Sequence, residues 1–155
     1  MALNRLGKAR LLALAVPCAL LGGALLAQYG FGLFPCEMCW WQRYPHVAAI
    51  ALAALAFLRP PGRGFIALAG LAIAVSAAIG LFHAGVEYHW WQGFTECTSN
   101  AAKGGDPLEA IMNAPLIRCD VAQWSLLGVS LAGFNFLFSG AGAAAIFTAL
   151  AGKAR

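Results

Sequence analysis

Long runs of apolar residues, separated by short polar segments, are the feature that most constrains this chain. Residues 11–29 contain no charged residue, and about 20 apolar residues are enough for a helix to cross a bilayer. Further apolar runs cover residues 41–58, 64–86 and 125–150. Only helices and closed barrels satisfy their backbone hydrogen bonds in lipid. We therefore expect an all-α membrane protein in which residues 1–155 form one bundle of four transmembrane helices.

The composition agrees with this class. Only 10% of the 155 residues are charged, against about 25% in soluble domains, so we expect no sizeable soluble domain. The chain has no basic cluster with interleaved aromatic residues, which argues against a nucleic-acid partner. A basic start followed by an apolar run also fits a cleaved signal peptide, but the run exceeds the usual length of about 7–15 residues, and we expect an uncleaved first span.

Charged residues are divided unevenly between the two sides of the predicted bundle. Four spans place both termini on one side together with seven of the ten Lys and Arg residues, whereas all six acidic residues fall on the other. The positive-inside rule makes the first side cytoplasmic. The loops at 30–40 and 87–124 then face outward. The seven cations are Arg5, Lys8, Arg10, Arg59, Arg63, Lys153 and Arg155.

The second outward loop contains signals for a short helix. Asp106 followed by Pro107 is typical of a helix start. Leu108, Ile111 and Met112 then share one face, and such a helix is expected to lie on the membrane surface. Ser125 is the residue that we expect to cap the last span.

Two cysteines, Cys36 and Cys39, lie at the predicted start of the second span. One turn of helix brings residues at this spacing together, and Arg43 lies on the same helical face as Cys39. Pro35 suits the first position of that helix. A helix N-terminus and a nearby positive charge both stabilise a thiolate. The pattern favours a redox-active dithiol at the outer boundary of the membrane.

Cys97 and Cys119 lie in the second outward loop, in a compartment that permits disulfides. The four outward cysteines fit structural disulfides, a four-thiolate zinc site or a thiol relay. Cys97 and Cys119 lack the short spacing of a second zinc knuckle, and we expect no metal site. The relay is favoured, with a lipid-soluble quinone as the natural electron acceptor. Cys18, in the middle of the first span, is expected to have no redox role.

Three stretches resemble motifs of one family. Residues 35–43 resemble the C-x-x-C-x-x-Q-R motif of the DsbB family of disulfide bond formation proteins. Residues 83–87 resemble its H-x-G-V-E stretch, and residues 119–128 resemble its C-D-x-x-x-W-x-x-L-G entry to the last span. The resemblance covers nearly the whole chain.

This resemblance implies a protein-disulfide:quinone oxidoreductase of the bacterial inner membrane. A reduced DsbA-like thioredoxin-fold oxidase would attack Cys97 and reduce the Cys97–Cys119 disulfide. Exchange with the Cys36–Cys39 disulfide would then reoxidise the Cys97–Cys119 pair. Cys39 would face ubiquinone or menaquinone. In the known DsbA–DsbB–quinone system the DsbA couple is strongly oxidising, at about −120 mV, so a more oxidising acceptor is required.

The resemblance also assigns the cofactor site. Arg43 would stabilise charge on the quinone, His83 would line the same site, and Gln42 belongs to the motif. Two alternatives remain. A quinone oxidoreductase of the vitamin K epoxide reductase type usually carries its dithiol in the last span rather than before the second. A four-span membrane protein with structurally stapled loops would not need Cys36 for function.

Overall fold

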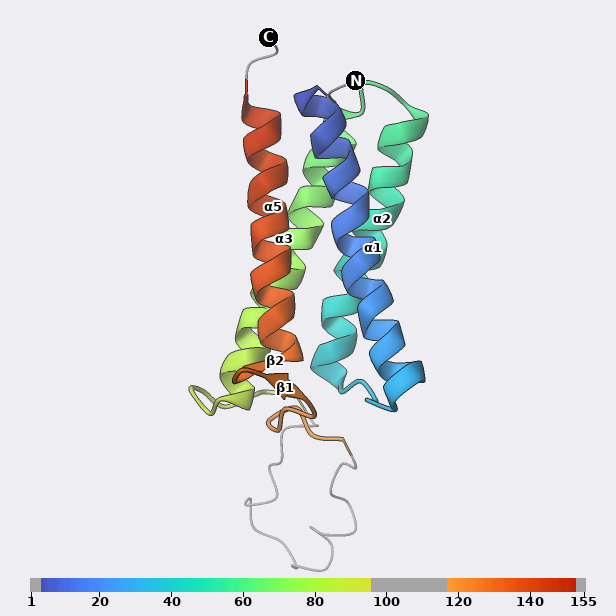
Figure 1. Cartoon of the computed structure of the whole chain (residues 1–155). Helices are drawn as coiled ribbons and strands as arrows, with labels where there is room; N and C mark the ends of the chain where they lie inside the picture. The colour runs from blue at the N-terminus through green and yellow to red at the C-terminus, as the bar shows by residue number, and fades with distance from the viewer. Residues whose placement is uncertain (1–3, 96–116, 153–155) are drawn as a thin grey trace, which may run out of the picture.

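The computed structural model describes residues 4–95 and 117–152. Within them the chain forms four helices, α1 (Arg5–Phe31), α2 (Glu37–Leu58), α3 (Arg63–Glu87) and α5 (Leu131–Ala151). Figure 1 shows the helices side by side with their axes roughly aligned. Helix α1 begins where α5 ends, and we call this the termini end of the bundle. The opposite end, where α1 and α3 end, is the loop end.

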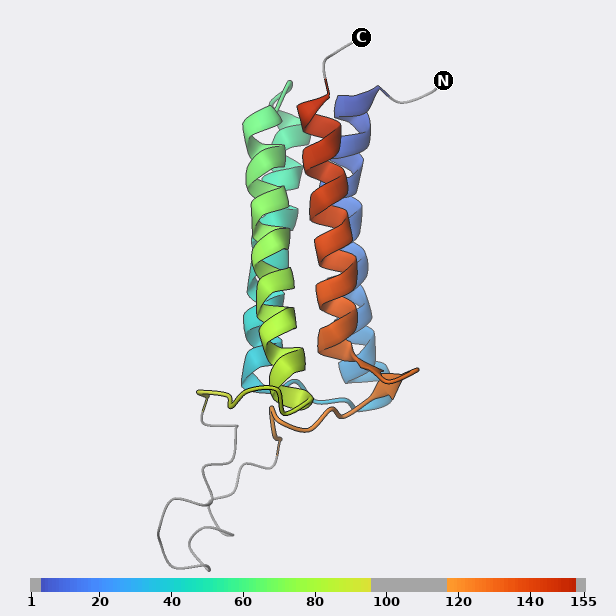
Figure 2. The same ribbon diagram turned by 90° about the vertical axis from the view of Figure 1, so that its left-hand side faces the viewer.

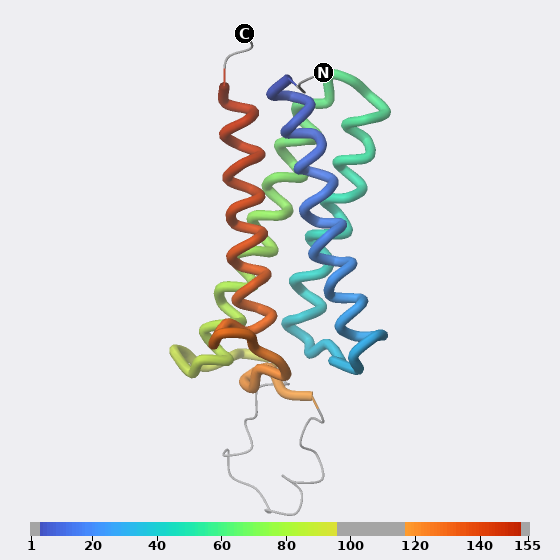
Figure 3. Tube along the Cα trace, in the orientation of Figure 1, coloured from blue at the N-terminus to red at the C-terminus, as the bar shows by residue number. Residues whose placement is uncertain are grey.

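The helices form an up-and-down bundle. Helix α1 packs against α2 and α5, and α3 also packs against α2 and α5, so α1 and α3 occupy opposite corners. The Cα trace follows this path from one end to the other, and the view turned by 90° shows the same bundle from the side (Figures 2 and 3). The short turn between α2 and α3 makes these helices antiparallel neighbours, as short connections do in bundles.

Three of the described helices, α1, α3 and α5, are long and apolar enough to cross a membrane. Helix α2 has 22 residues, which gives a length of about 33 Å at 1.5 Å per residue. Its first half carries Gln42, Arg43 and His46, which lower its hydropathy. The structure is that of a helical membrane protein, and the crossing by α2 remains a prediction.

Helices α1 and α2 begin before the apolar runs from which they were predicted. The side chain of Asn4 accepts a hydrogen bond from the backbone nitrogen of Gly7 at 2.7 Å and caps α1. Cys36 caps α2, so Pro35 precedes the cap instead of taking the first helical position. An apolar run marks the part of a helix that lipid can accommodate, whereas capping side chains determine where the helix starts.

The predicted start of the last span at Ser125 is wrong. Ser125–Leu126 (β1) and Val129–Ser130 (β2) form a short antiparallel pair, with Ser125 opposite Ser130. Leu127 and Gly128 between them have positive φ angles of 52° and 80°, as tight hairpin turns require. Ser130 Oγ then accepts from the Gly133 nitrogen at 3.1 Å, and α5 begins at Leu131.

The predicted helix after Asp106 and the loop cysteine Cys97 lie outside the described residues.

Two buried clusters hold the described bundle together. The cluster nearer the termini end consists mainly of alanines, which allow helices to approach closely. Its members are Ala9, Ala13, Ala49, Ala53, Ala56, Ile66, Ala69, Ile73, Ala143 and Ile146. The cluster at the loop end comprises Cys36, Met38, Val86 and Cys119.

At Gly80 the backbones of α3 and α5 lie close together. A Cβ added there would lie 3.0 Å from the Ala132 oxygen and from the Phe136 nitrogen, both backbone atoms of α5. We expect Gly80→Val to lower the free energy of unfolding by about 1–3 kcal/mol, the usual cost of overpacking. Denaturant unfolding in mixed micelles measures it. Gly140→Val is the matched control, because a Cβ at Gly140 meets nothing within 4 Å; equal losses in both variants would contradict the expectation.

Candidate functional site

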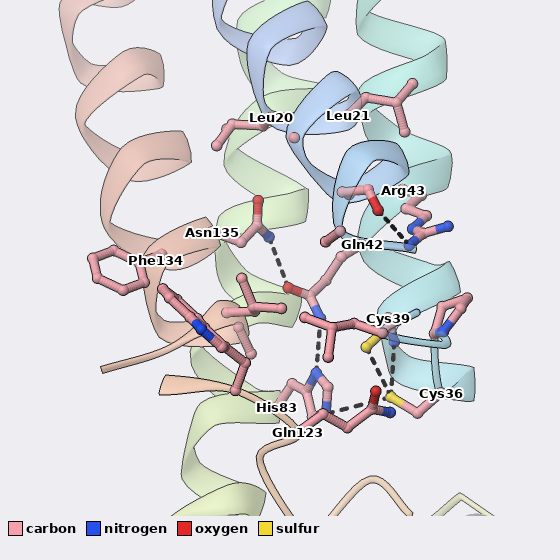
Figure 4. A pocket seen from close by; sticks show the side chains of 18 of the residues that line it. Leu20, Leu21, Cys36, Cys39, Gln42, Arg43, His83, Gln123, Phe134 and Asn135 are labelled. Atoms are coloured by element: carbon pink, nitrogen blue, oxygen red, sulfur yellow. Dashed lines mark hydrogen bonds between the residues drawn. The ribbon is translucent and has the colours of Figure 1, made fainter. Parts of the chain in front are cut away.

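A cavity of about 320 Å³ lies between the helices towards the loop end. Helices α1 and α5 supply most of its apolar wall, which includes Leu20, Leu21, Gly23, Ala24, Phe134 and Phe138. Helices α2 and α3 supply polar side chains, as the close-up in Figure 4 shows. The cavity is therefore apolar on one side and lined by groups capable of chemistry on the other.

Cys36 and Cys39 line this cavity as free cysteines. Their sulfur atoms lie 3.0 Å apart, and Cys36 Sγ accepts the Cys39 backbone N–H at 3.3 Å. The hydrogen bond that the Cys36 thiol donates to the Cys39 sulfur, together with burial, raises the pKa of Cys36. In the reduced pair Cys36 is therefore the hydrogen-bond donor and the sulfur of Cys39 the acceptor.

His83 reaches the dithiol from α3 and is only 2% exposed. Its Nε2 lies 3.5 Å from Cys36 Sγ and 3.7 Å from Glu87 Oε1. The donor atoms of Cys36, Cys39 and His83 all lie within 4.8 Å of one another. Two thiolates and an imidazole are ligands that zinc accepts, so the geometry offers a donor set in a chain for which we expected no metal site.

Gln42 connects His83 to α5. Gln42 Nε2 lies 2.8 Å from His83 Nδ1 and donates to the Met38 carbonyl oxygen at 3.1 Å. Gln42 Oε1 accepts from Asn135 Nδ2 at 2.8 Å. Asn135 Nδ2 also donates to the Ser76 carbonyl oxygen at 3.1 Å. Three helices are thus joined by side-chain hydrogen bonds beside the dithiol.

The same hydrogen-bond network extends to His46. His46 Nε2 lies 3.0 Å from Asn135 Oδ1 and 3.0 Å from Ser76 Oγ. Ser76 Oγ donates to the Gln42 carbonyl oxygen at 2.8 Å, and Ser139 Oγ donates to Asn135 Oδ1 at 2.9 Å. Most of these polar groups therefore satisfy one another, as a low-dielectric interior requires, whereas His46 Nδ1 is buried without a hydrogen-bond partner.

Arg43 is held against α1 instead of extending to the headgroups. Its Nη1 donates to Gln28 Oε1 at 2.5 Å, and Nη2 donates to the Ala24 carbonyl oxygen at 3.2 Å. The guanidinium carbon lies 4.9 Å from the centre of the Trp40 ring. Arg43 lines the cavity, so a fixed positive charge stands one helical turn beyond Cys39.

Cys119 is fully buried beside Cys36 in the loop-end cluster and is disulfide-bonded. The next residue, Asp120, accepts two hydrogen bonds from Arg118, of 2.8 Å to Nε and 2.5 Å to Nη2. This pairing holds the pKa of the Asp120 carboxyl below its usual range. The two residues that flank Cys119 are therefore paired with each other across it.

The structure brings together most of the residues that the sequence singled out. Cys36, Cys39, Gln42, Arg43 and His83 all line the one cavity. Cys119 is buried next to it, and Cys97 lies outside the described residues. The chemical roles given to these residues stay predictions.

Sequence reasoning missed four residues of the site: Gln28, Ser76, Glu87 and Asn135. Asn135 carried a usable signal, because a polar residue inside an apolar span is a functional-site hypothesis by default. Glu87 was quoted only as part of a motif, and its Oε2 is buried without a hydrogen-bond partner. Gln28 and Ser76 look like ordinary polar residues until the helices are placed beside each other.

Fold and site together define a class: a helical membrane protein with a free, partly buried dithiol lining an apolar cavity. A family model described as "Disulfide bond formation protein DsbB" matches residues 6–149. The chain belongs to the DsbB family. The family supports a role in disulfide bond formation and, with it, oxidoreductase chemistry.

Several curated proteins named "Disulfide bond formation protein B" are similar to this chain. The one from Aromatoleum aromaticum is 34% identical over 135 residues, covering 79% of this chain and 79% of the relative. The one from Verminephrobacter eiseniae is 33% identical, covering 77% and 71%. The one from Marinobacter nauticus is 33% identical, covering 78% and 78%. No solved structure gives a significant match.

The Arg118–Asp120 pair gives a prediction about pH. A depressed carboxyl pKa means that the pair is intact above the usual carboxyl range and is lost only as the pH falls through the lowered value. We expect Asp120→Asn to speed phosphine reduction of the Cys119 disulfide at neutral pH by at most about fivefold, since an exposed pair is worth about 0–1 kcal/mol. Timed thiol labelling measures the rate.

The ratio of the Asp120→Asn rate to the wild-type rate should not change between pH 7 and about 5, because the wild-type carboxylate stays charged over this range and protonation of the phosphine affects both proteins equally. Glu37→Gln, at the first position of α2, is the matched control and should leave the rate unchanged. A ratio that falls to one already at pH 6 would contradict the assignment to Asp120.

Proposed function

We propose that this protein reoxidises a DsbA-like thioredoxin-fold oxidase in the periplasm and passes the electrons to a membrane quinone. The net reaction converts a partner dithiol and a quinone into a partner disulfide and a quinol, so two electrons and two protons move together. The observation that carries the proposal is the free dithiol of Cys36 and Cys39 on the wall of an apolar cavity, with Arg43 beside it.

The residues around the cavity fit a quinone. A volume of about 320 Å³ lies within the usual range of small-molecule sites, and the apolar walls of α1 and α5 suit a ring with a lipid tail. A Cβ added at Gly23 would meet nothing within 4 Å, so α1 leaves open space there. When bound, the quinone supplies the acceptor for two electrons and two protons.

Arg43 and the dithiol have separate tasks in this proposal. Gln28 and Ala24 hold the guanidinium of Arg43 in place on the cavity wall, where its positive charge would stabilise negative charge on a quinone. Of the two cysteines, Cys39 lies nearer to Arg43 along the helix. Preorganised charge of this kind stabilises negative charge that develops during a reaction.

Cys119 links the dithiol to the outward loop. It belongs to the same buried cluster as Cys36, so exchange between the loop disulfide and the dithiol needs only short movements. The partner's thiolate would attack Cys97, and the electron pair would then pass through Cys119 to the Cys36–Cys39 disulfide. Each exchange breaks one S–S bond and forms another.

The proposed topology places four spans in the bacterial inner membrane with both termini in the cytoplasm. Arg5, Arg10, Arg59 and Arg63 lie at the termini end of the described bundle, which suits the cytoplasmic side. The alternative of the vitamin K epoxide reductase type is disfavoured because its dithiol belongs to the last span, whereas here the pair caps α2. The stapled-loop alternative does not explain free thiols at Cys36 and Cys39.

Turnover with a quinone tests the proposal. Full-length protein in lipid nanodiscs is mixed with a reduced DsbA-type oxidase and a soluble ubiquinone analogue. We expect one quinone to be reduced for each partner dithiol oxidised, because the two couples exchange two electrons. Cys39→Ser should abolish turnover, whereas Cys18→Ser, in α1 and exposed, should not. The proposal fails if quinone absorbance is unchanged, or if Cys39→Ser turns over at the wild-type rate.

Filling the cavity tests the position of the quinone. We expect Gly23→Phe to raise KM for the quinone analogue by about tenfold or more, since the ring would occupy the space at α1; tenfold corresponds to about 1.4 kcal/mol. Exchange with the partner should keep its rate. Gly22→Phe is the matched control, because a Cβ there also meets nothing within 4 Å and Gly22 is not among the residues lining the cavity. Equal KM values for both variants would place the quinone elsewhere.

A further inference from the structure

A chain of hydrogen bonds runs through the loop-end half of the bundle to the dithiol. It passes from His46 to Asn135 (3.0 Å), to Gln42 (2.8 Å), to His83 (2.8 Å) and to Cys36 (3.5 Å). Figure 4 shows the last four side chains of this series joined by dashed lines. We call these five residues the polar chain. Cys36 is the end of the polar chain at which redox chemistry is possible.

Two backbone carbonyls set the direction of the polar chain. A carbonyl oxygen only accepts hydrogen bonds. The Met38 oxygen lies 3.1 Å from the Gln42 amide and therefore faces its nitrogen, Nε2. The Ser76 oxygen lies 3.1 Å from the Asn135 amide and faces Nδ2 in the same way. Side-chain amides are otherwise ambiguous in orientation, but here the backbone determines both.

The orientation of Gln42 determines where His83 carries its proton. Gln42 Nε2 donates, so His83 Nδ1 must accept. A neutral imidazole has one N–H, which is then on Nε2, facing Cys36 Sγ at 3.5 Å and Glu87 Oε1 at 3.7 Å. The ring also donates to the backbone of Cys119, so the Cys36 sulfur shares this N–H with a carbonyl acceptor. An imidazolium would direct a second N–H of His83 at the N–H of Gln42. The polar chain therefore favours neutral His83 with its proton on Nε2.

We infer that Gln42 and Asn135 are positioning residues that hold the His83 proton on Nε2, so that His83 donates a hydrogen bond to the Cys36 sulfur. This assigns Gln42 a physical role within its motif and adds Asn135, on α5, to the site. The inference deepens the proposed function, but only its consequence for catalysis rests on that function.

The consequence concerns closure of the Cys36–Cys39 disulfide. Closing the S–S bond removes one proton from each thiol, both of which would pass to the quinone, and the Cys36 sulfur becomes a thiolate before the bond forms. A fixed N–H donor stabilises that thiolate. The two sulfurs then give up two electrons, and the quinone takes these together with two protons. His83 keeps its own proton throughout, and its role is to stabilise charge on the sulfur.

The position of this proton also bears on metal binding. Cys36, Cys39 and His83 have the spacing of a zinc donor set, but zinc needs the lone pair of a ring nitrogen. With the proton on Nε2, that lone pair is absent on the side facing the sulfurs. Gln42→Glu presents an acceptor to Nδ1, which moves the proton there and frees Nε2. A carboxylate behind a zinc-binding histidine is a common supporting arrangement.

The first experiment determines directly which ring nitrogen of His83 carries the proton. The chain has three histidines, so ¹⁵N-histidine NMR of the protein in detergent resolves each ring, with His46→Gln and His89→Gln for assignment. We expect the Nε2–H form of His83 in the wild type and in Ser139→Ala, which removes a donor to Asn135 Oδ1 and a contact with His46 Nε2 but leaves the Gln42–His83 contact in place. Asn135→Leu should give a mixture, and Gln42→Glu the Nδ1–H form. A wild-type His83 with Nδ1–H overturns the inference, as does an unchanged tautomer in Gln42→Glu.

The second experiment measures a gain in zinc affinity, which a merely structural role of Gln42 would not produce. Cys97→Ala and Cys119→Ala are present throughout, so Cys36, Cys39 and Cys18 are the remaining thiols. Zinc affinity of the reduced protein is measured against a chromophoric chelator. We expect Gln42→Glu to bind zinc at least about tenfold more tightly than its parent, in line with the usual effect of supporting residues on metal affinity. Adding His83→Ala should remove the gain, and adding Cys18→Ala should not.

Equal zinc affinity with glutamine or glutamate at position 42 contradicts the inference, and so does a gain that survives His83→Ala. Neither experiment uses a quinone or a partner protein. Loss of quinone turnover with an intact Nε2–H tautomer would thus reject the proposed function alone. A wrong tautomer with normal turnover would reject the inference alone.

Discussion

Polar side chains inside this bundle depend on hydrogen bonds within the protein, because lipid offers no partner and an unpaired buried polar group is costly. Gln42 meets this constraint with bonds to Met38, His83 and Asn135. These bonds tie α2 to α3 and α5 at the level of the dithiol. Apolar packing alone would leave each helix nearly free to rotate about its own axis, because lipid tails are as apolar as the faces of the neighbouring helices. The polar contacts select one rotation for each helix.

Such contacts require the helix backbones to be close. A Cβ on Gly80 would lie 3.0 Å from Asn135 Nδ2, so the space that lets Asn135 reach from α5 to Ser76 on α3 exists because residue 80 has no side chain. Tight packing recurs at Gly142, where a Cβ would lie 2.8 Å from Val16. The small residues of the termini-end cluster serve the same purpose without polar groups. Close packing at one end and hydrogen bonds at the other therefore share the task of holding the bundle.

The sequence predicted the class of fold well because apolar run length is a strong signal in a membrane protein. It also predicted that Cys36, Arg43, Gln42 and His83 belong together, largely through resemblance to a family. It missed the pairing of Asn135 with Gln42, because a run that is apolar on all faces does not reveal how its helix is rotated. The hairpin at residues 125–130 was missed for a similar reason: its residues are as apolar as the helix that follows, and only two consecutive positive φ angles distinguish it.

The place of the dithiol at a helix start has its own physical logic. An N-cap position normally holds an oxygen-bearing side chain that accepts a backbone N–H. Here a sulfur takes that role, with the Cys39 N–H donating to Cys36 Sγ at 3.3 Å. The same position puts both sulfurs at the positive end of the helix dipole, where negative charge on either is least costly. Cys36 then packs with Cys119, while the charge of Arg43 follows one turn after Cys39. A dithiol moved one turn deeper into α2 would lose the free N–H groups of the helix start and the contact with Cys119. Only at the helix start can the dithiol both exchange with the loop disulfide and line the cavity.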